Sequence, residues 1–161
     1  MLPMIQRDDF VARNSSGDKV FTPRVEGAFE KIIRHGNTPT SYWWEVIDKN
    51  GVKYFYGKYS SDAGTNANCV LSDNSGNIAC WQLAETRDLN GNFVRYTYNI
   101  ETLPVALGAP GHGAKQIFPE SIQYTSTDSK AGAYRIDFVL ANTLRNDYTV
   151  SASAGSPVFT G

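Results

Sequence analysis

The sequence predicts an all-β protein, an antiparallel meander of hairpins that together form a strip of sheet. Aromatic residues make up 12% of the 161 residues, and nine Tyr, eight Phe and three Trp favour the half-buried, pleated surface of a strand. Asn-Gly and Ser-Gly pairs recur between aromatic runs, as is typical of hairpins. No stretch of a dozen residues keeps its apolar positions at the spacing of an amphipathic helix.

Three segments have the pattern of a hairpin, with an apolar or aromatic arm on each side of a turn. They cover residues 41–57, 69–83 and 81–100, and their turns are centred on Asn50-Gly51, Ser75-Gly76 and Asn90-Gly91. Asn-Gly tolerates the two positive φ angles of a type I′ turn, so we expect that two-residue turn in the first hairpin.

The second arm of the third hairpin has one aromatic face and one mixed face in this pattern. Two sets of side chains alternate along it: Val94, Tyr96 and Tyr98 on one face, and Phe93, Arg95 and Thr97 on the other. Such a strand is expected in a sheet that packs mainly on one side. We expect six aromatic residues on the packed side: Trp43, Trp44, Trp81, Tyr96, Tyr98 and Phe138.

The rest of the chain adds further strands and one long loop. Residues 25–34 alternate as a strand, and residues 121–126 and 133–140 form another strand pair. Residues 103–116 are rich in Gly and Pro without periodicity, which predicts a loop. The count is then seven or eight strands. We expect an extended or poorly ordered N-terminal segment (1–22), a β-sheet module (23–147) and a small polar tail (148–161) that looks cut from a longer protein.

Charge and hydropathy exclude several classes of partner. The formal net charge is -1, with 15 Lys and Arg against 16 Asp and Glu, so nothing favours nucleic acid or an anionic membrane. No apolar run is long enough to cross a bilayer. The first ten residues lack the basic start and apolar stretch of a signal peptide, so we expect any export signal to lie outside this chain.

The two cysteines, Cys69 and Cys80, flank the turn of the second hairpin. Folding that turn places them on facing strands, where an oxidising compartment would allow a disulfide. The other interpretation is a pair of half-buried thiols, and two cysteines carry too little pattern to decide.

Side chains that could carry chemistry form no complete site. The segment from Asp88 to Asn92 resembles the start of a calcium loop, but position 99 holds Asn where the bidentate Glu is needed, so we expect turn capping. His35 and His112 lie far apart and match no zinc spacing with the cysteines. Glu85 would form a carboxylate pair with Asp88, but we interpret it as a solvent-facing strand charge. The prediction is no catalytic, cofactor or metal site, and therefore no enzyme.

The segments "DNSGNIACWQL" and "DLNGNFVRYTYN" share a turn, a Gly-Asn step and an alternating arm. The second resembles the YD repeats of Rhs proteins, with their D-x-x-G-N-x-x-x-Y-x-Y pattern. In order along residues 23–147, the motifs "FEKIIRHGNTPTSYWWEVIDKNGVKYFYG", "GNIACWQLAETRDLNGNFVRYTYN" and "SIQYTS…YRIDFVLANTLRND" resemble the amino-terminal region of the Salmonella plasmid-virulence B-protein family. That region also begins the B components of insecticidal toxin complexes.

The resemblance implies a structural role in a secreted or cell-surface protein. In these families the region contributes strips of an Rhs-type β-shell that encloses a toxic carboxy-terminal domain until delivery. No cofactor is implied, and the partners would be other segments of the shell or toxin subunits, with self-association through sheet edges. The scaffold positions implied are Trp43, Trp44, Gly51, Tyr56, Gly57, Trp81, Asp88, Gly91, Asn92, Tyr96, Tyr98 and Arg145.

An alternative function remains open from the aromatic content of the first hairpin. Its alternating side chains make the ribbon aromatic on both faces, so either both faces are covered by other parts of a shell, or one stacks on a ligand. The second case describes a secreted β-sandwich that binds glycan or a protein receptor through surface Trp and Tyr. Cys80 departs from the family pattern, where a polar residue is common.

Overall fold

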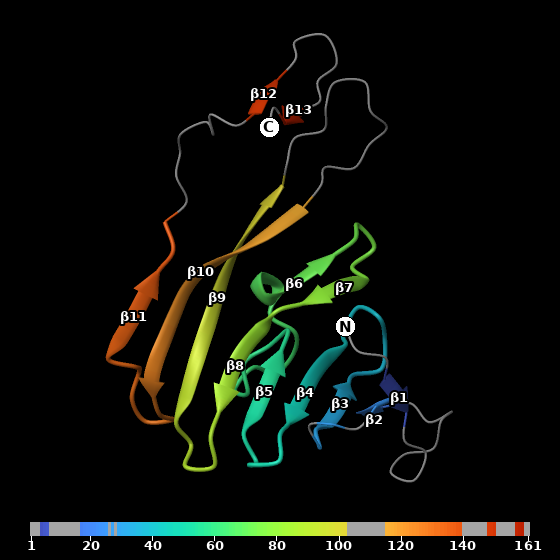
Figure 1. Ribbon diagram of the computed structural model, residues 1–161, viewed down its shortest axis with the longest axis vertical. Coiled ribbons are helices and arrows are strands. Elements are labelled where there is room, and N and C mark those ends of the chain that lie inside the picture. The colour runs from blue at the N-terminus through green and yellow to red at the C-terminus, as the bar shows by residue number, and fades with distance from the viewer. Residues whose placement is uncertain are drawn as a thin grey trace.

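The computed structural model describes residues 4–6, 17–25, 27, 29–102, 115–139, 148–150 and 157–159. In these residues the chain is all-β, as predicted, apart from one short 3-10 turn, η1 (Ala67–Cys69). Nine strands lie side by side in one antiparallel sheet in the order β1-β2-β3-β4-β5-β8-β9-β10-β11 (Figure 1). Their bounds are β1 Met4–Gln6, β2 Lys19–Pro23, β3 Lys31–His35, β4 Trp43–Ile47, β5 Lys53–Tyr56, β8 Leu83–Arg87, β9 Phe93–Thr102, β10 Lys115–Ser126 and β11 Tyr134–Asp137.

Two smaller sheets accompany the large one. The hairpin of β6 (Val70–Ser72) and β7 (Ile78–Trp81) is inserted between β5 and β8, and it lies apart from the row of nine strands (Figure 1). β12 (Tyr148–Val150) pairs with β13 (Pro157–Phe159). The three predicted hairpins are confirmed as β4–β5, β6–β7 and β8–β9, because local turn chemistry and alternation are enough to define them.

The predicted type I′ turn is wrong. In the β4–β5 loop only Gly51 has a positive φ, 79°, and the Gly51 amide donates to the Asp48 carbonyl at 3.0 Å. The Asp48 carboxylate accepts hydrogen bonds from the amides of Asn50 and Val52 at 2.8 and 3.0 Å, which stabilises a three-residue loop with a left-handed glycine at its third position. The loops that begin at Asp73 and Asp88 have the same bonds.

Two predicted strand limits also need correction. The strand expected at residues 25–34 occupies only Lys31–His35, because Phe29 has a positive φ of 51° and Val25 is exposed. The loop expected at residues 103–116 is shorter at its end, since Lys115 and Gln116 already pair with Thr102 and Glu101 of β9. Residues 103–114 lie outside the described part of the chain.

The inserted segment between β5 and β8 is closed at its base by backbone hydrogen bonds. The Gly57 amide donates to the Gln82 carbonyl at 2.9 Å, and the Gln82 amide donates to the Cys69 carbonyl at 2.8 Å. Cys69 is therefore level with Gln82, whereas Cys80 pairs with Leu71, so the cysteines do not face each other as predicted. Both are free thiols, Cys69 buried and Cys80 half-buried. Burial raises the pKa of the Cys69 thiol to about 11.

The large sheet has two chemically different faces, set by strand alternation. We call one the charged face, with members Glu45, Lys53, Phe55, Glu85, Arg87, Phe93 and Arg95. We call the other the aromatic face, with members Trp44, Val46, Tyr54, Tyr56, Val94, Tyr96 and Ile122. The two predicted faces of β9 are confirmed by this register.

Few apolar side chains are buried in the described residues. They are Val20, Ile32, Phe55, Cys69, Val70, Ile78, Ala84 and Phe93. Of the six aromatics expected on the packed side, five are half-buried, with Trp43 and Trp44 on opposite faces. Phe138 is 43% exposed and follows the edge strand β11, so its placement on the packed side was wrong.

The part of the chain expected to be an extended or poorly ordered N-terminal segment contains strands. β1 and β2 both pair in the large sheet, and Val20 of β2 is buried. In the described residues no helix has the length and apolar character needed to cross a membrane.

Gly57 offers a test of how tightly the inserted segment docks on the sheet. Its φ is +84°, and a Cβ there would lie 2.7 Å from Trp81 Cδ1 and 3.2 Å from Val70 Cγ1. Gly91 has a similar φ of +82° with no atom closer than 3.9 Å to a Cβ. We expect Gly91→Ala to destabilise by about 1–2 kcal/mol from the left-handed backbone alone, and Gly57→Ala by about 1–3 kcal/mol more from overpacking. Urea unfolding followed by Trp fluorescence measures both, and equal losses would contradict the tight packing.

Candidate functional site

The charged face is organised around one row of paired residues that crosses four strands. Glu45 of β4 lies opposite Phe55 of β5, Phe55 opposite Glu85 of β8, and Glu85 opposite Arg95 of β9. Because paired residues of antiparallel strands share a face, all four side chains project to the same side. The row places two acidic groups and one basic group around a buried aromatic ring.

Glu85 is the centre of the row and is fully buried, with 0% of its surface exposed. Arg87 Nε donates to one carboxylate oxygen at 3.0 Å, and Arg95 Nε donates to the other at 3.1 Å. Ser60 Oγ also donates to the first oxygen at 2.6 Å. The expectation of a solvent-facing Glu85 is therefore wrong, because two guanidinium groups and a hydroxyl replace the water that an exposed carboxylate would bind.

A short strap, residues 58–62, covers this cluster from the inserted segment. Lys58 Nζ donates to the Asp62 carbonyl, and the Tyr59 amide donates to the Asp62 carboxylate at 3.0 Å, which closes the strap on itself. Ser60 accepts a hydrogen bond from Arg87, and Ser61 accepts one from Arg95 at 3.1 Å. The sheet and the strap are thus joined by charge-assisted hydrogen bonds.

Aromatic rings complete the surroundings of the two arginines. The guanidinium carbons of Arg87 and Arg95 each lie 4.7 Å from the centroid of the Phe93 ring, and Arg95 lies at the same distance from Tyr59. These distances are within the range of cation–π attraction. Burial raises the pKa of Tyr59 to about 12, so its hydroxyl stays protonated and donates to the Tyr96 carbonyl at 3.3 Å.

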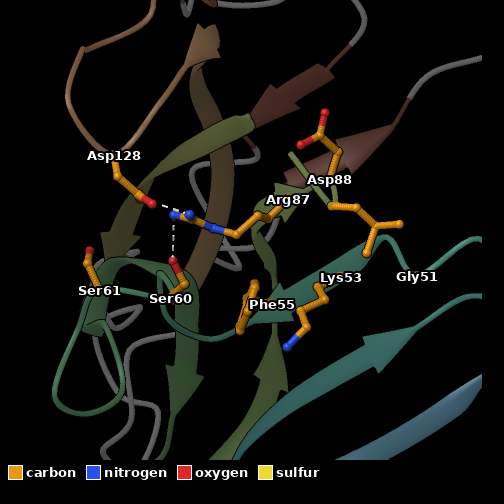
Figure 2. A pocket seen from close by; sticks show the side chains of 9 residues that line it. Gly51, Lys53, Phe55, Ser60, Ser61, Arg87, Asp88 and Asp128 are labelled. Carbon is orange, nitrogen blue, oxygen red and sulfur yellow. Dashed lines mark hydrogen bonds and ion pairs between the residues drawn. The ribbon is translucent and has the colours of Figure 1, made fainter. Parts of the chain in front are cut away.

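A surface cavity of about 480 Å³ opens beside the cluster (Figure 2). Figure 2 shows Arg87 reaching across it to Asp128 of the β10–β11 turn and to Ser60 of the strap. Lys53, Phe55 and Ser61 also line it. The Arg87–Asp128 bond, at 2.8 Å, ties the β10–β11 turn to β8 across β9.

A second polar cluster lies on the same face toward β3. His35 places Nδ1 2.8 Å from Asp18 and Nε2 3.1 Å from Glu45, and Lys53 Nζ lies 3.0 Å from Glu45. The hydrogen bond with His35 is the largest cause that holds the pKa of Glu45 at about 2, against burial, which raises it. The hydrogen bond and charge of Lys53 lower the pKa further.

The rings of this second cluster also stack. The Trp43 and His35 rings stack with their centroids 3.8 Å apart. Lys58 Nζ lies 4.5 Å from the centroid of the Trp43 ring. Phe55 is 6.3 Å from Trp43 and connects this cluster to the Glu85 row. The charged face is therefore one continuous network of paired charges and rings.

In the described part of the charged face, the two buried acidic groups already have bonding partners. Both oxygens of Glu85 accept hydrogen bonds from arginines, and the two oxygens of Glu45 contact Lys53 and His35. Ser60 donates to a carboxylate that has no histidine partner. Among the described residues no group of three His, Cys, Asp or Glu side chains could hold a metal ion. His112 lies outside them.

The implied scaffold positions fall into turns and half-buried rings. Asp88 caps its loop by accepting from the amides of Asn90 and Asn92 and from the Asn92 side chain, so the prediction of turn capping is confirmed. Trp44 lies edge-on to Trp81 at 6.0 Å, and the Trp81 indole N–H donates to the Tyr42 carbonyl at 2.5 Å. The Tyr98 hydroxyl donates to the Leu83 carbonyl. Arg145 lies outside the described residues.

The Glu85 cluster was missed from sequence although a signal for it was present. Glu85 and Arg87 share one face of an alternating arm, and Phe93 and Arg95 share one face of the next. A three-residue loop between the arms sets Arg87 opposite Phe93 and Glu85 opposite Arg95. The strap could not have been found this way, because Ser60 lies 25 positions before Glu85.

Comparison with known protein families identifies the family of this chain. The family model of the Salmonella virulence plasmid 65kDa B protein, SpvB, matches residues 9–143. The chain belongs to the SpvB family. The match begins before the limit of 23 expected from the motifs and covers most of the chain. Among proteins with curated descriptions, none matches the chain.

Solved structures share the fold. The N-terminal domain of the effector protein SpvB from Salmonella typhimurium strain LT2 is similar with a TM-score of 0.53 and 22% identity, covering 69% of this chain and 36% of that one. The TcdB2-TccC3-TEV structure has a TM-score of 0.58 and 16% identity, covering 99% of this chain and 8% of that one. The TcdB2-TccC3-Cdc42 structure has a TM-score of 0.52 and 15% identity, covering 80% of this chain and 6% of that one. The chain thus spans about a third of the SpvB domain and less than a tenth of the toxin-complex chains.

Removal of the Glu85 carboxylate should unfold the charged face. Glu85→Ala leaves two part-buried guanidinium groups without their shared anion, and we expect a loss of about 3–5 kcal/mol in the free energy of unfolding. Glu85→Gln keeps an acceptor oxygen and should lose less. Glu120→Ala, on an exposed position of β10, is the matched control. Urea unfolding measures all three, and a loss for Glu85→Ala no larger than the control would contradict the central role of the cluster.

Glu45 should make stability depend on acid pH. Its pKa is lowered from 4.5 to about 2 in the folded chain, so its contribution is complete above pH 4.5 and is lost as pH falls toward 2. We expect the unfolding free energy of the wild type to fall more steeply across this window than that of Glu45→Gln. The two proteins differ only at residue 45, so the difference between the two curves reports Glu45 and its contacts. Parallel curves would show that the His35 and Lys53 contacts do not stabilise the ionised form.

Proposed function

We propose that the chain is a non-catalytic structural module of a toxin-complex-like protein, a segment of wall in a β-shell that encloses and helps to deliver a toxic cargo domain. The protein that carries it would be secreted or displayed on the cell surface. Its partners would be other segments of the same shell or partner toxin subunits. No cofactor takes part. Residues 23–147, together with the strands β1 and β2 that pair in the same sheet, would be the shell module, and a tail would follow it.

The observation that carries this proposal is a wide single sheet with paired charges on one face and half-buried aromatic rings on the other. On the charged face the ionic groups satisfy one another, so that face needs no ligand to be stable. On the aromatic face Trp44, Tyr54 and Tyr56 are only half-buried. A sheet of nine strands gains stability from neighbours that cover its remaining apolar area, because its described residues include five buried apolar side chains: Val20, Ile32, Phe55, Ala84 and Phe93.

The mechanism of such a wall is mechanical and steric. Backbone ladders join successive strands, and cross-strand pairs add roughly 0.2–1 kcal/mol each. The capped loops at Asp48 and Asp88 define the register of their hairpins. Trp44 of the large sheet lies edge-on to Trp81 of the inserted segment, which joins the two parts. Membership of the SpvB family and the fold shared with toxin-complex chains support this assignment.

The alternative is a β-sandwich that binds glycan or a receptor through surface aromatic rings. The described strands form one large sheet and two hairpin sheets, and no described sheet covers the aromatic face as a second layer of comparable width. Saturable quenching of Trp fluorescence by a soluble oligosaccharide would favour this alternative over the shell.

Enclosure can be tested by protease protection in the product of the whole reading frame that includes this chain. We expect a cargo segment to survive proteinase K while the shell is intact, and to be digested once Arg95→Pro interrupts β9 and its contact with Glu85. Glu120→Ala, at an exposed position of β10, is the control that should preserve protection. Equal digestion of every segment in the wild type would overturn the proposed function.

A further inference from the structure

The edge strand β11 has the properties of a docking site for another strand. Among the described strands it pairs with β10 alone, and each of its four residues is exposed. The Phe138 amide donates to the Glu120 carbonyl, and the register pairs Ile136 with Ile122 and Tyr134 with Tyr124. Since inward and outward amides alternate along an antiparallel strand, the backbone groups of Arg135 and Asp137 point away from β10. Such a row of outward groups is a template for strand pairing.

The side chains of β11 are self-complementary about Ile136. Arg135 and Asp137 share the charged face, are 56% and 57% exposed, and form an ion pair with each other at 2.6 Å. Tyr134, Ile136 and Phe138 alternate with them and keep 59%, 48% and 43% of their surface exposed. If a second copy of β11 lay antiparallel and centred on Ile136, Arg135 of one copy would face Asp137 of the other, twice. Tyr134 would face Phe138 on the opposite side of the sheet.

Backbone geometry and charge together select this register over its neighbours. A shift by one residue would set an outward amide against an inward one, so only shifts by two residues keep the hydrogen bonds. A shift by two residues in one direction sets Arg135 against Arg135, and in the other direction sets Asp137 against Asp137. Like charges directly opposite destabilise a strand pair, whereas opposite charges stabilise it. The register centred on Ile136 alone gives two opposite-charge pairs.

We propose that β11 is a homotypic docking edge, through which two copies of this chain join their large sheets about a two-fold axis at Ile136. The contact is isologous and closes after two copies, because each β11 is used once. It deepens the proposed function by naming the partner of one wall edge, and rests on that function only for its role in a shell. The occupant is a second copy of this chain, chosen by the charge complementarity of Arg135 and Asp137.

A charge-swap experiment tests the docking edge on the full 161-residue chain. In an Arg135→Asp dimer, residue 135 of each copy would be an Asp facing Asp137 of the other, and in an Asp137→Arg dimer Arg would face Arg at the same two places. Each variant alone should therefore have a dimer Kd at least about tenfold higher, equivalent to about 1.4 kcal/mol. The double variant R135D/D137R restores opposite charges and should restore the dimer. An equimolar mixture of the two single variants should form a heterodimer. Size-exclusion chromatography with light scattering measures each case, with circular dichroism to compare folding.

Every outcome decides the inference. A wild type that stays monomeric at all concentrations overturns it, and so does a dimer that the single variants do not weaken, because the contact would then use another surface. Weakened single variants that neither mixing nor the double variant restores also overturn it. These readouts are separate from protease protection of a cargo, so the docking edge and the proposed enclosure can fail independently.

Discussion

The buried carboxylate of Glu85 is the interaction on which the arrangement of this sheet depends. Removing a carboxylate from water costs several kcal/mol even after relaxation, and that cost is offset only when partners occupy both oxygens. Arg87, Arg95 and Ser60 supply those partners from β8, β9 and the strap. Arg87 continues to Asp128, so the β10–β11 turn is joined to the same charge. A single buried anion thus connects β8, β9, the strap and the β10–β11 turn.

The cluster acts on specificity of pairing more than on net stability. Apolar side chains of similar volume often stabilise a core as well as a buried ion pair does. A slip of β8 against β9 by one residue would move Glu85 to the aromatic face, beside Tyr96 and without a cation. The penalty for an unpaired buried charge is large enough to exclude that register. The charged face therefore aligns the strands, and the aromatic face is left available to pack against neighbours.

Features set by neighbouring residues could be predicted from the sequence, whereas contacts between residues far apart in the chain could not. The hairpins β4–β5, β6–β7 and β8–β9 follow from turn residues and alternation within about twenty positions, and these were predicted. The burial of Glu85 depends on a strap that lies 25 residues away, and a strand pattern alone could not distinguish it from a solvent-facing charge. Phe138 was misplaced for a related reason, because alternation describes which side a residue takes and not whether the sheet continues beyond it.

The three-residue loop between β8 and β9 explains how the Glu85 cluster arises. A two-residue Asn-Gly turn would set Leu89 opposite Asn92, and therefore Glu85 opposite Tyr96. Asp88 instead accepts from the amides of Asn90 and Asn92, which adds one residue to the loop and sets Glu85 opposite Arg95. One half-buried aspartate thereby decides which residues of β9 share a face with the buried charge. The loop at Asp48 has the same bonds and sets the register of β4–β5 in the same way. The loop at Asp73 also has these bonds, but a register shift between Leu71 and Ser72 follows it in β6–β7. In these hairpins the faces are thus set by bonds within each loop, between residues no more than four positions apart.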